Sequence, residues 1–168
     1  MSTDRPQSEA LPLLLVDVDG VISLWGWPEP ERPDGAWTLV DGIGHFLSAG
    51  AAGRLRELSD VFALVWCSGW EERANEHLPR LVGLGPLAHL RFDGTLPGAM
   101  HAHWKLAAID AHAGPYRAVA WVDDAFNAAC HAWAAERPGP TLLVTTQPAV
   151  GFTAAQATTL RAWATDPR

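Results

Sequence analysis

Apolar residues along the chain fall into short continuous runs and into segments where they recur on one side of a helix. The continuous runs predict buried strands at Leu11–Val18, Val61–Ser68, Arg117–Asp124 and Thr141–Thr146, with a shorter strand at residues 87–93. The other segments predict helices at Ala49–Ser59, Glu71–Leu81, His103–His112, Ala125–Glu136 and Ala154–Ala164, the last capped by Thr153. This alternation predicts an α/β protein with a mainly parallel sheet between two helical layers, a three-layer α/β/α, Rossmann-like fold.

Two stretches fall outside this alternation. Residues 1–10 are polar, and we expect them to be disordered. Residues 11–168 are expected to form a single domain with a short insert at about residues 21–41, which is rich in proline and tryptophan. Within this insert, Ala36–Val40 has the pattern of one arm of a β-hairpin.

Composition places the chain among globular proteins and limits the classes of partner that it is expected to bind. Hydrophobic residues make up 48% of the 168 residues and charged residues 18%. The formal net charge of −7 disfavours a broad surface for nucleic acids or anionic membranes, but it is compatible with a small pocket that grips one phosphate. Because the sequence has neither a membrane-spanning apolar run nor a signal-peptide pattern, we expect a cytoplasmic protein without membrane contact. Cys67 and Cys130 are expected to be buried as small hydrophobic residues.

Polar residues gather where the predicted strands end. These residues are Asp17, Asp19, Ser68, Gly69, Asp123 and Asp124. Because ligands of parallel sheets bind beyond the carboxyl ends of the strands, we expect these groups to share one small volume. Lys105 begins the helix before the third strand and is the only lysine in the chain. Since every other basic position holds arginine, this position is expected to require a compact ammonium group.

The charges of these groups indicate their chemistry. Four carboxylates in one small volume repel one another unless a divalent cation joins them, and Mg²⁺ suits oxygen ligands best. A cation beside the Ser68 hydroxyl, the Lys105 ammonium and free backbone N–H groups makes a site for a phosphate dianion. The sequence therefore predicts Mg²⁺-dependent phosphate chemistry.

The same residues resemble the motifs of the haloacid dehalogenase (HAD) superfamily of phosphotransferases. The segment "DVDGV" resembles its first motif, and Ser68, Lys105 and the acidic pair of "WVDD" resemble the next three in the same order. The chain is similar to small cap-less HAD domains of actinobacterial type, some of which are fused to RNA-repair proteins. It departs from the common pattern by having serine in the second motif and a bare acidic pair in the last. The division of metal-binding roles between Asp123 and Asp124 therefore stays open.

The resemblance implies a role for each residue of the motifs. Asp17 would be the nucleophile that forms a phospho-aspartyl intermediate, and Asp19 would be the general acid and base. The transferring phosphoryl group would be bound by Ser68, the N–H of Gly69 and Lys105. The ligands of Mg²⁺ would be the Asp17 carboxylate, the Asp19 backbone carbonyl, Asp123 and Asp124.

The expected activity is Mg²⁺-dependent hydrolysis of a phosphate monoester. The gaps between the motifs leave no room for a large cap domain, so the site is expected to be open. An open site suits a phosphorylated small molecule or nucleotide as substrate. It also suits the end of a nucleic acid, an alternative that the charge of −7 disfavours. A further alternative is a binding or regulatory module that keeps the fold but has little turnover.

Several aromatic residues and histidines near the motifs have two interpretations each. Trp25, Trp27 and Trp70 either pack the insert onto the body or form a stacking wall for a flat leaving group. His101 and His103 have a spacing seen in metal sites, but we expect surface or helix-capping positions for them. The remaining histidines, His45 among them, show no usable pattern.

Overall fold

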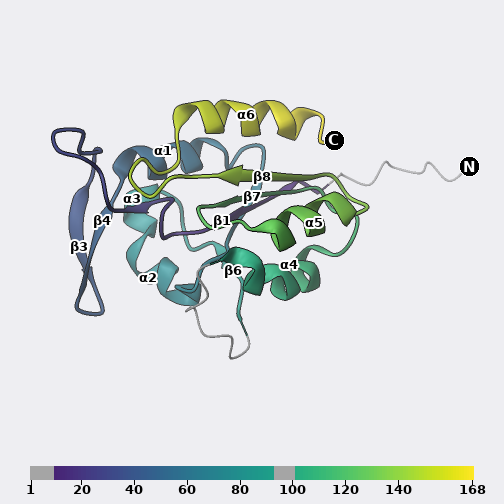
Figure 1. The fold of residues 1–168 in the computed structure, drawn as a ribbon, viewed down its shortest axis with the longest axis horizontal. Coiled ribbons are helices and arrows are strands. Elements are labelled where there is room, and N and C mark those ends of the chain that lie inside the picture. Colours follow the sequence, from purple (N-terminus) through teal and green to yellow (C-terminus); the bar gives the residue numbers. More distant parts are fainter. Residues whose placement is uncertain (1–9, 93–100) are drawn as a thin grey trace, which may run out of the picture.

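The computed structural model describes residues 10–92 and 101–168 and has the predicted layered α/β architecture (Figure 1). Its larger sheet is parallel, with the strand order β6-β5-β1-β7-β8. The strands are β1 (Leu13–Val16), β5 (Ala63–Trp66), β6 (Ala88–His89), β7 (Val119–Asp123) and β8 (Thr141–Thr145). Because all five strands run in the same direction, their carboxyl ends lie together, on the side of the molecule that carries the hairpin of residues 36–47 (Figure 1).

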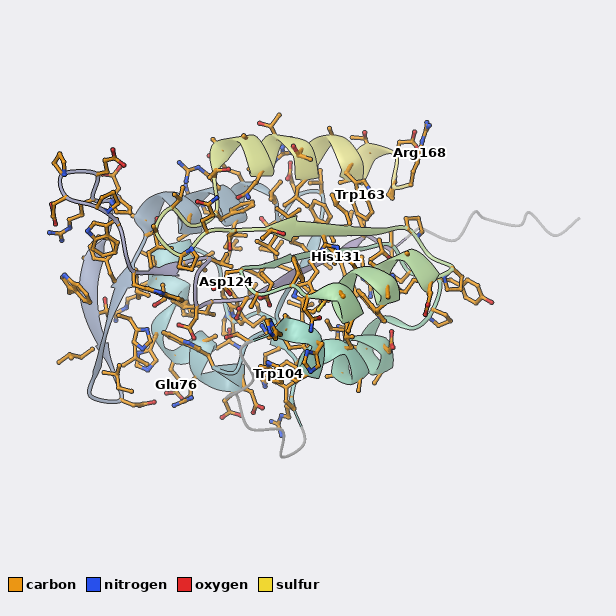
Figure 2. All side chains as sticks on the ribbon, in the orientation of Figure 1. Glu76, Trp104, Asp124, His131, Trp163 and Arg168 are labelled. Carbon is orange, nitrogen blue, oxygen red and sulfur yellow. The ribbon has the colours of Figure 1, made fainter. Side chains whose placement is uncertain are left out.

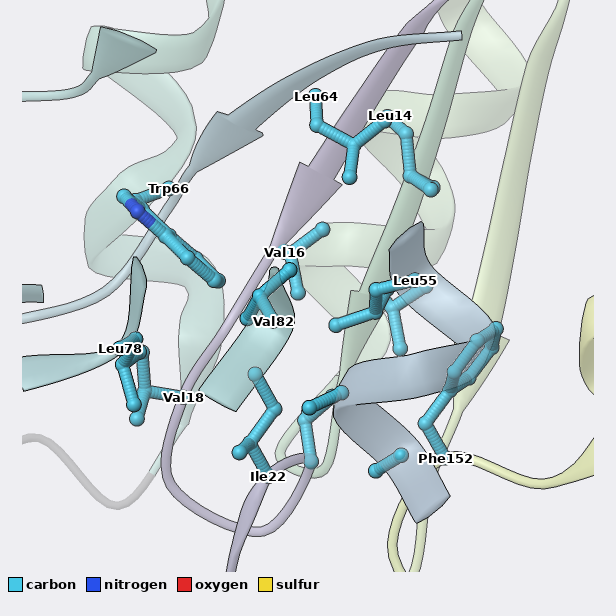
Figure 3. Close-up of a cluster of buried hydrophobic side chains, with 14 of the residues drawn as sticks. Leu14, Val16, Val18, Ile22, Leu55, Leu64, Trp66, Leu78, Val82 and Phe152 are labelled. Carbon is cyan, nitrogen blue, oxygen red and sulfur yellow. The ribbon is translucent and has the colours of Figure 1, made fainter. Parts of the chain in front are cut away.

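Alternating side chains of the central strands supply two hydrophobic cores. Leu14 and Val16 of β1 belong to one core, and Leu13 and Leu15 belong to the other. The first core, shown in part in Figure 3, is covered by α1 (Ala49–Glu57), α2 (Ala74–His77), α3 (Pro79–Val82) and α6 (Ala154–Thr165). The second core is covered by α4 (Leu106–Ala113) and α5 (Ala128–Glu136). Because both faces are covered, the central strands β1 and β7 are buried throughout, and this explains their continuous apolar sequences.

A small antiparallel sheet follows β1 and forms the insert. Its strands, in spatial order, are β2 (Ser23–Leu24), β4 (Ile43–Leu47) and β3 (Ala36–Val40). The predicted hairpin arm is β3, whereas its partner β4 was not predicted and extends the antiparallel structure beyond residue 41. Asp41 and Gly42 form the tip of the hairpin with φ angles of 50° and 82°. Asp-Gly pairs adopt these left-handed values readily in hairpin turns.

Helix boundaries differ from the prediction at three places. The first turn of the helix predicted at His103–His112 is the 3₁₀ segment η2 (Ala102–Lys105), which precedes α4. The segment predicted as one helix over residues 71–81 is divided into the 3₁₀ segment η1 (Glu71–Arg73), α2 and α3. Pro79 begins α3, because proline has no backbone N–H and is tolerated at a first helical position but not within a helix. Asn127 caps α5 by accepting a hydrogen bond from the Cys130 N–H, so this helix begins three residues later than predicted.

Other expectations agree with the described residues where these can be compared. Thr153 caps α6 as predicted, and Gln156 completes a capping box. Cys67 and Cys130 are buried free thiols, as expected. Residues 1–9 of the segment predicted to be disordered, and the end of the strand predicted at residues 87–93, lie outside the described ranges. Within residues 10–92 and 101–168, every helix is too short or too polar to cross a membrane.

Candidate active site

One cavity is lined by all seven residues that the sequence singles out. It has a volume of about 220 Å³ and lies beyond the carboxyl ends of β1, β5 and β7. The predicted residues that line it are Asp17, Asp19, Ser68, Gly69, Lys105, Asp123 and Asp124. They converge because β1 lies between β5 and β7 in the sheet, so the ends of three non-consecutive strands are neighbours. Figure 2 shows Asp124 near this end of the sheet, with Trp104 on the side of α4.

Three carboxylates and one ammonium group form the buried centre of the site. Side-chain oxygens of Asp17, Asp123 and Asp124 lie within 4.8 Å of one another. The Nζ atom of Lys105 lies 2.6 Å from Asp123 Oδ2 and 3.2 Å from Asp17 Oδ2. Lys105 occupies the end of the 3₁₀ segment η2 (Ala102–Lys105), directly before α4. The lysine therefore bridges two acids that come from adjacent strands.

Backbone groups fix the orientation of the two bridged carboxylates. The N–H of Val18 donates to Asp17 Oδ1 at 2.8 Å, and the N–H of Ala125 donates to Asp123 Oδ1 at 3.0 Å. Each of these carboxylates therefore uses one oxygen for a backbone donor and the other for Lys105. The Asp123 backbone carbonyl accepts a hydrogen bond from the Thr146 N–H, which ties the end of β7 to β8.

Asp124 reaches the cluster because residue 20 is glycine. A Cβ atom at Gly20 would lie 2.4 Å from Asp124 Cγ, which is closer than two side chains can approach. Gly20 also has a φ of +75°, a value that other residues rarely adopt. The Thr146 hydroxyl donates to the Gly20 carbonyl at 2.9 Å and holds this turn in place. Gly20 of the segment "DVDGV" thus provides the space that the Asp124 carboxylate occupies.

Burial and mutual repulsion shift the proton affinities of these groups. Burial raises the pKa of Asp17 to about 8, although the neighbouring Lys105 lowers it in part. Burial, together with the charge of Asp123, raises the pKa of Asp124 to about 6. For Lys105, burial lowers the pKa, but the charges of Asp17 and Asp123 outweigh it and leave the pKa above its ordinary value. The ammonium group is therefore charged at neutral pH.

The donor set fits a hard divalent cation. Lys105 offsets one of the three clustered carboxylates and leaves two acids without a partner of opposite charge within the cluster. The raised pKa values of Asp17 and Asp124 express the cost of this arrangement without a cation. Carboxylate oxygens are the ligands that Mg²⁺ prefers, so the residues present suit this ion.

Asp19 lines the same cavity but does not belong to the group of three clustered acids. Its Oδ2 atom accepts a hydrogen bond of 3.0 Å from the indole Nε1–H of Trp70, and its Oδ1 atom lies 3.7 Å from His45 Nδ1. The ring of His45 packs edge-on against Trp70, with ring centroids 4.8 Å apart. Its Nδ1 atom lies 2.8 Å from the Ser23 hydroxyl. Sequence reasoning missed His45 because its place depends on how β4 folds over the site.

Ser68 and Gly69 form the turn that leaves β5. Ser68 is buried, and its hydroxyl accepts a hydrogen bond from the Trp70 N–H at 3.3 Å. Its backbone carbonyl accepts a hydrogen bond from the N–H of Glu71, where η1 begins. The turn therefore presents one hydroxyl and the backbone of Gly69 to the cavity.

Other cavity residues were not predicted, and the three tryptophans singled out in the sequence lie elsewhere. His101, Ala102, Trp104 and Ala125 complete the lining. His103 does not line the cavity; its Nδ1 atom lies 2.9 Å from the Asn127 side-chain amide. Trp27 packs against Phe46 of the hairpin, with ring centroids 4.6 Å apart, and Trp25 is half-exposed. Trp70 is buried, so its ring packs in the core and offers no open face for stacking.

The parallel sheet, the carboxylates at its strand ends and the bridging lysine define the HAD class of α/β domain. Residues 13–157 match the family described as the HAD domain in Swiss Army Knife RNA repair proteins. The chain belongs to this family, as the order of its motifs predicted. Among curated proteins, the chain has no match.

Proposed function

We propose that this HAD domain is a Mg²⁺-dependent phosphohydrolase that acts on a phosphate monoester through a phospho-aspartyl intermediate at Asp17. The observation that carries the proposal is the Asp17 carboxylate, which lines the cavity beside Lys105 and within 4.8 Å of two further acids. The cavity is smaller than typical ligand pockets, and its volume of about 220 Å³ suits a phosphoryl group better than a whole nucleotide. The remainder of the substrate then lies outside it.

The first step transfers the phosphoryl group to the protein. An oxygen of the ionised Asp17 carboxylate attacks phosphorus, and the bond between phosphorus and the ester oxygen breaks. The departing oxygen takes the proton of Asp19, so the leaving group is released as a neutral alcohol. This role is supported by the position of Asp19, which lines the same cavity outside the acidic cluster.

The second step regenerates the protein. The ionised Asp19 carboxylate takes a proton from a water molecule, whose oxygen attacks the phosphorus of the phospho-aspartyl group. The bond between phosphorus and the Asp17 oxygen breaks, and inorganic phosphate leaves. Asp17 is then a free carboxylate and Asp19 is protonated, as both were before the first step.

The remaining residues bind and neutralise the phosphoryl group. Lys105 carries a positive charge between Asp17 and Asp123, where it offsets charge that Asp17 shares with the phosphate. The Ser68 hydroxyl and the N–H of Gly69 donate hydrogen bonds to phosphoryl oxygens. Mg²⁺ held by the Asp17 carboxylate, the Asp19 backbone carbonyl, Asp123 and Asp124 supplies further positive charge for the carboxylates and the phosphate.

The proposal is tested by turnover of p-nitrophenyl phosphate with and without Mg²⁺. We expect activity that needs Mg²⁺, is abolished by EDTA and returns when the ion is added back. The variant Asp17→Asn keeps the shape of the nucleophile and is expected to be inactive. Asp34→Asn, an exposed position in the loop before β3, is the matched control and is expected to keep full activity.

Two outcomes contradict this function. Turnover by Asp17→Asn near that of the unchanged protein assigns the nucleophile elsewhere. Folded, Mg²⁺-loaded protein that is inactive on p-nitrophenyl phosphate, nucleotides and sugar phosphates favours the alternative of a binding or regulatory module.

A second candidate substrate is the phosphorylated end of an RNA strand. The family match to a domain of RNA repair proteins favours it, and the small cavity accommodates an end phosphate as readily as a small ester. The test compares nucleoside monophosphates with oligoribonucleotides that carry a 5′- or 3′-phosphate. A kcat/KM at least about tenfold higher for the oligonucleotide, equivalent to 1.4 kcal/mol, supports this candidate, and equal or lower values reject it.

A further inference from the structure

We propose that Trp70 is a positioning residue for Asp19, and that His45 of the β3–β4 hairpin supports Trp70 in this role. The inference rests on the acid–base role of Asp19 in the proposed function. It assigns a purpose to two residues that the chemistry above does not use, one from the turn after β5 and one from β4.

Asp19 needs such a support because it is held differently from the other acids. Its side chain is 47% exposed, whereas those of Asp17 and Asp123 are 10% and 1% exposed. Asp17 and Asp123 are each fixed by a backbone N–H and by Lys105. Within the described residues, the hydrogen bond to the Asp19 carboxylate comes from Trp70 Nε1 at 3.0 Å. Without it, the longer approach of His45 Nδ1, 3.7 Å from Asp19 Oδ1, is a weaker restraint on the carboxylate.

The indole also distinguishes the two oxygens of Asp19. An indole N–H donates and does not accept hydrogen bonds. It occupies one lone pair of Asp19 Oδ2. Because this bond is stronger to an oxygen that carries no proton, it favours Oδ1 as the oxygen that carries the transferable proton. The indole N–H of Trp70 thus sets the orientation in which Asp19 protonates the departing oxygen.

The second part of the support comes from the hairpin. The His45 ring packs edge-on against Trp70 at 4.8 Å, and the ring of His77 lies on Trp70 at 6.3 Å in a similar geometry. His45 is itself held by the Ser23 hydroxyl of β2, 2.8 Å from its Nδ1 atom. The contacts run from β2 through β4 and Trp70 to Asp19. The hairpin therefore reaches the acid–base residue through the tryptophan and also directly, because His45 Nδ1 lies 3.7 Å from Asp19 Oδ1.

The experiment compares two substrates of nearly the same shape. The leaving oxygen of phenyl phosphate is basic, so the transfer of its phosphoryl group depends on protonation by Asp19. The leaving group of p-nitrophenyl phosphate is stable as an anion, so transfer from this substrate depends far less on that proton. The measured quantity is kcat/KM, which reports the steps up to phosphorylation of Asp17. Asp19→Asn serves as the reference variant and is expected to lose far more activity on phenyl phosphate than on p-nitrophenyl phosphate.

Trp70→Phe removes the indole N–H and keeps an aromatic ring in the core. We expect its kcat/KM to fall about 10- to 100-fold on phenyl phosphate and less than about threefold on p-nitrophenyl phosphate. Trp66→Phe is the matched control, because it removes an equivalent bond of 3.0 Å, from Trp66 Nε1 to Asn75 Oδ1, away from the cavity. A purely structural effect lowers kcat/KM for both substrates by the same factor. This is the result that we expect for Trp66→Phe.

His45→Ala provides a second, independent variant on the projecting hairpin. We expect the same selective loss, about 3- to 10-fold on phenyl phosphate, because Trp70 keeps its N–H but loses its support, and Asp19 loses its own contact with His45. Equal losses on both substrates in Trp70→Phe, or no loss, overturn the inference. If Trp70→Phe does not fold, His45→Ala alone decides between a selective and a uniform change.

The two proposals fail in distinguishable ways. If Asp17→Asn remains active, the proposed function itself is wrong. If Asp17→Asn is inactive and Asp19→Asn shows the selective loss, but Trp70→Phe and His45→Ala do not, only the positioning role is wrong.

Discussion

At the scale of single residues, the site depends on Gly20 as much as on its charged groups. A Cβ atom at this position meets the Asp124 carboxylate at 2.4 Å, so Gly20→Ala must displace the acid. We expect Mg²⁺ affinity to fall by about 10- to 100-fold, as measured by calorimetric titration. Gly42→Ala is the control, because its φ of +82° brings similar backbone strain with nothing within 4 Å.

Both glycine variants are expected to lose about 1–3 kcal/mol of unfolding free energy in urea, because alanine is strained at a positive φ. Only Gly20→Ala is expected to lose metal affinity. Equal Mg²⁺ affinity in Gly20→Ala and the unchanged protein contradicts a metal-binding role for Asp124.

The buried acids also predict how pH acts on the metal-free protein. Burial raises the pKa of Asp17 to about 8 and that of Asp124 to about 6, whereas an unfolded chain has values near 4. Between about pH 4 and pH 8 the folded protein therefore holds more protons than the unfolded chain. Because of this difference, these two acids lower the free energy of unfolding as pH rises through the window.

Under the proposed function, Mg²⁺ binds the ionised carboxylates and therefore counters this loss. We expect the rise in Tm on adding Mg²⁺ to be larger at pH 8 than at pH 6. Thermal melts at both pH values, with and without the ion, measure it. Asp124→Asn removes one of the two acids and is expected to show a smaller difference. A larger Mg²⁺ effect at pH 6 is the opposite of this expectation.

At the scale of elements, Asn75 joins the broken helix to the sheet. Its side-chain oxygen accepts hydrogen bonds from Trp66 Nε1 and the Leu87 N–H, and its amide donates to the Leu87 carbonyl. We expect Asn75→Ala to lower the unfolding free energy by about 2 kcal/mol in urea, because three hydrogen bonds are lost at one point. Its kcat/KM is expected to stay unchanged, since these bonds lie away from the cavity.

The neighbouring variant Glu76→Ala is the control for this effect. Glu76 is exposed and lies at the edge of the molecule in Figure 2. We therefore expect Glu76→Ala to change the unfolding free energy by less than about 0.5 kcal/mol. A loss in Asn75→Ala no larger than that in Glu76→Ala means that the three bonds contribute little.

The elements that the sequence predicts best are those whose pattern has a single physical cause. Strands covered on both faces are continuously apolar, so β1, β5 and β7 were recognised. The strand β4 was missed, because it is half-exposed and contains a glycine and a histidine. The region of η1, α2 and α3 was predicted as one helix, since its apolar spacing is helical although Pro79 divides it.

At the scale of the whole molecule, strand order converts distant motifs into one site. Asp17, Ser68, Lys105 and Asp123 are far apart in sequence, yet the parallel sheet brings them to one cavity. This convergence was predictable, because it follows from topology and from the chemistry of the residues. The contact between His45 and Asp19 was not, because it depends on the way the hairpin folds back over the strand ends.

The net charge of the molecule predicts how salt acts on nucleic-acid substrates. A chain of charge −7 repels a polyanionic oligonucleotide, and salt screens this repulsion. We expect kcat/KM for a phosphorylated oligoribonucleotide to rise about threefold between roughly 20 and 200 mM NaCl. For p-nitrophenyl phosphate, which carries far less charge, we expect less than about a twofold change over the same range. A steep fall of kcat/KM for the oligoribonucleotide with rising salt would instead indicate that basic side chains neutralise its phosphates. That result would mean that a local basic surface outweighs the negative net charge of the protein.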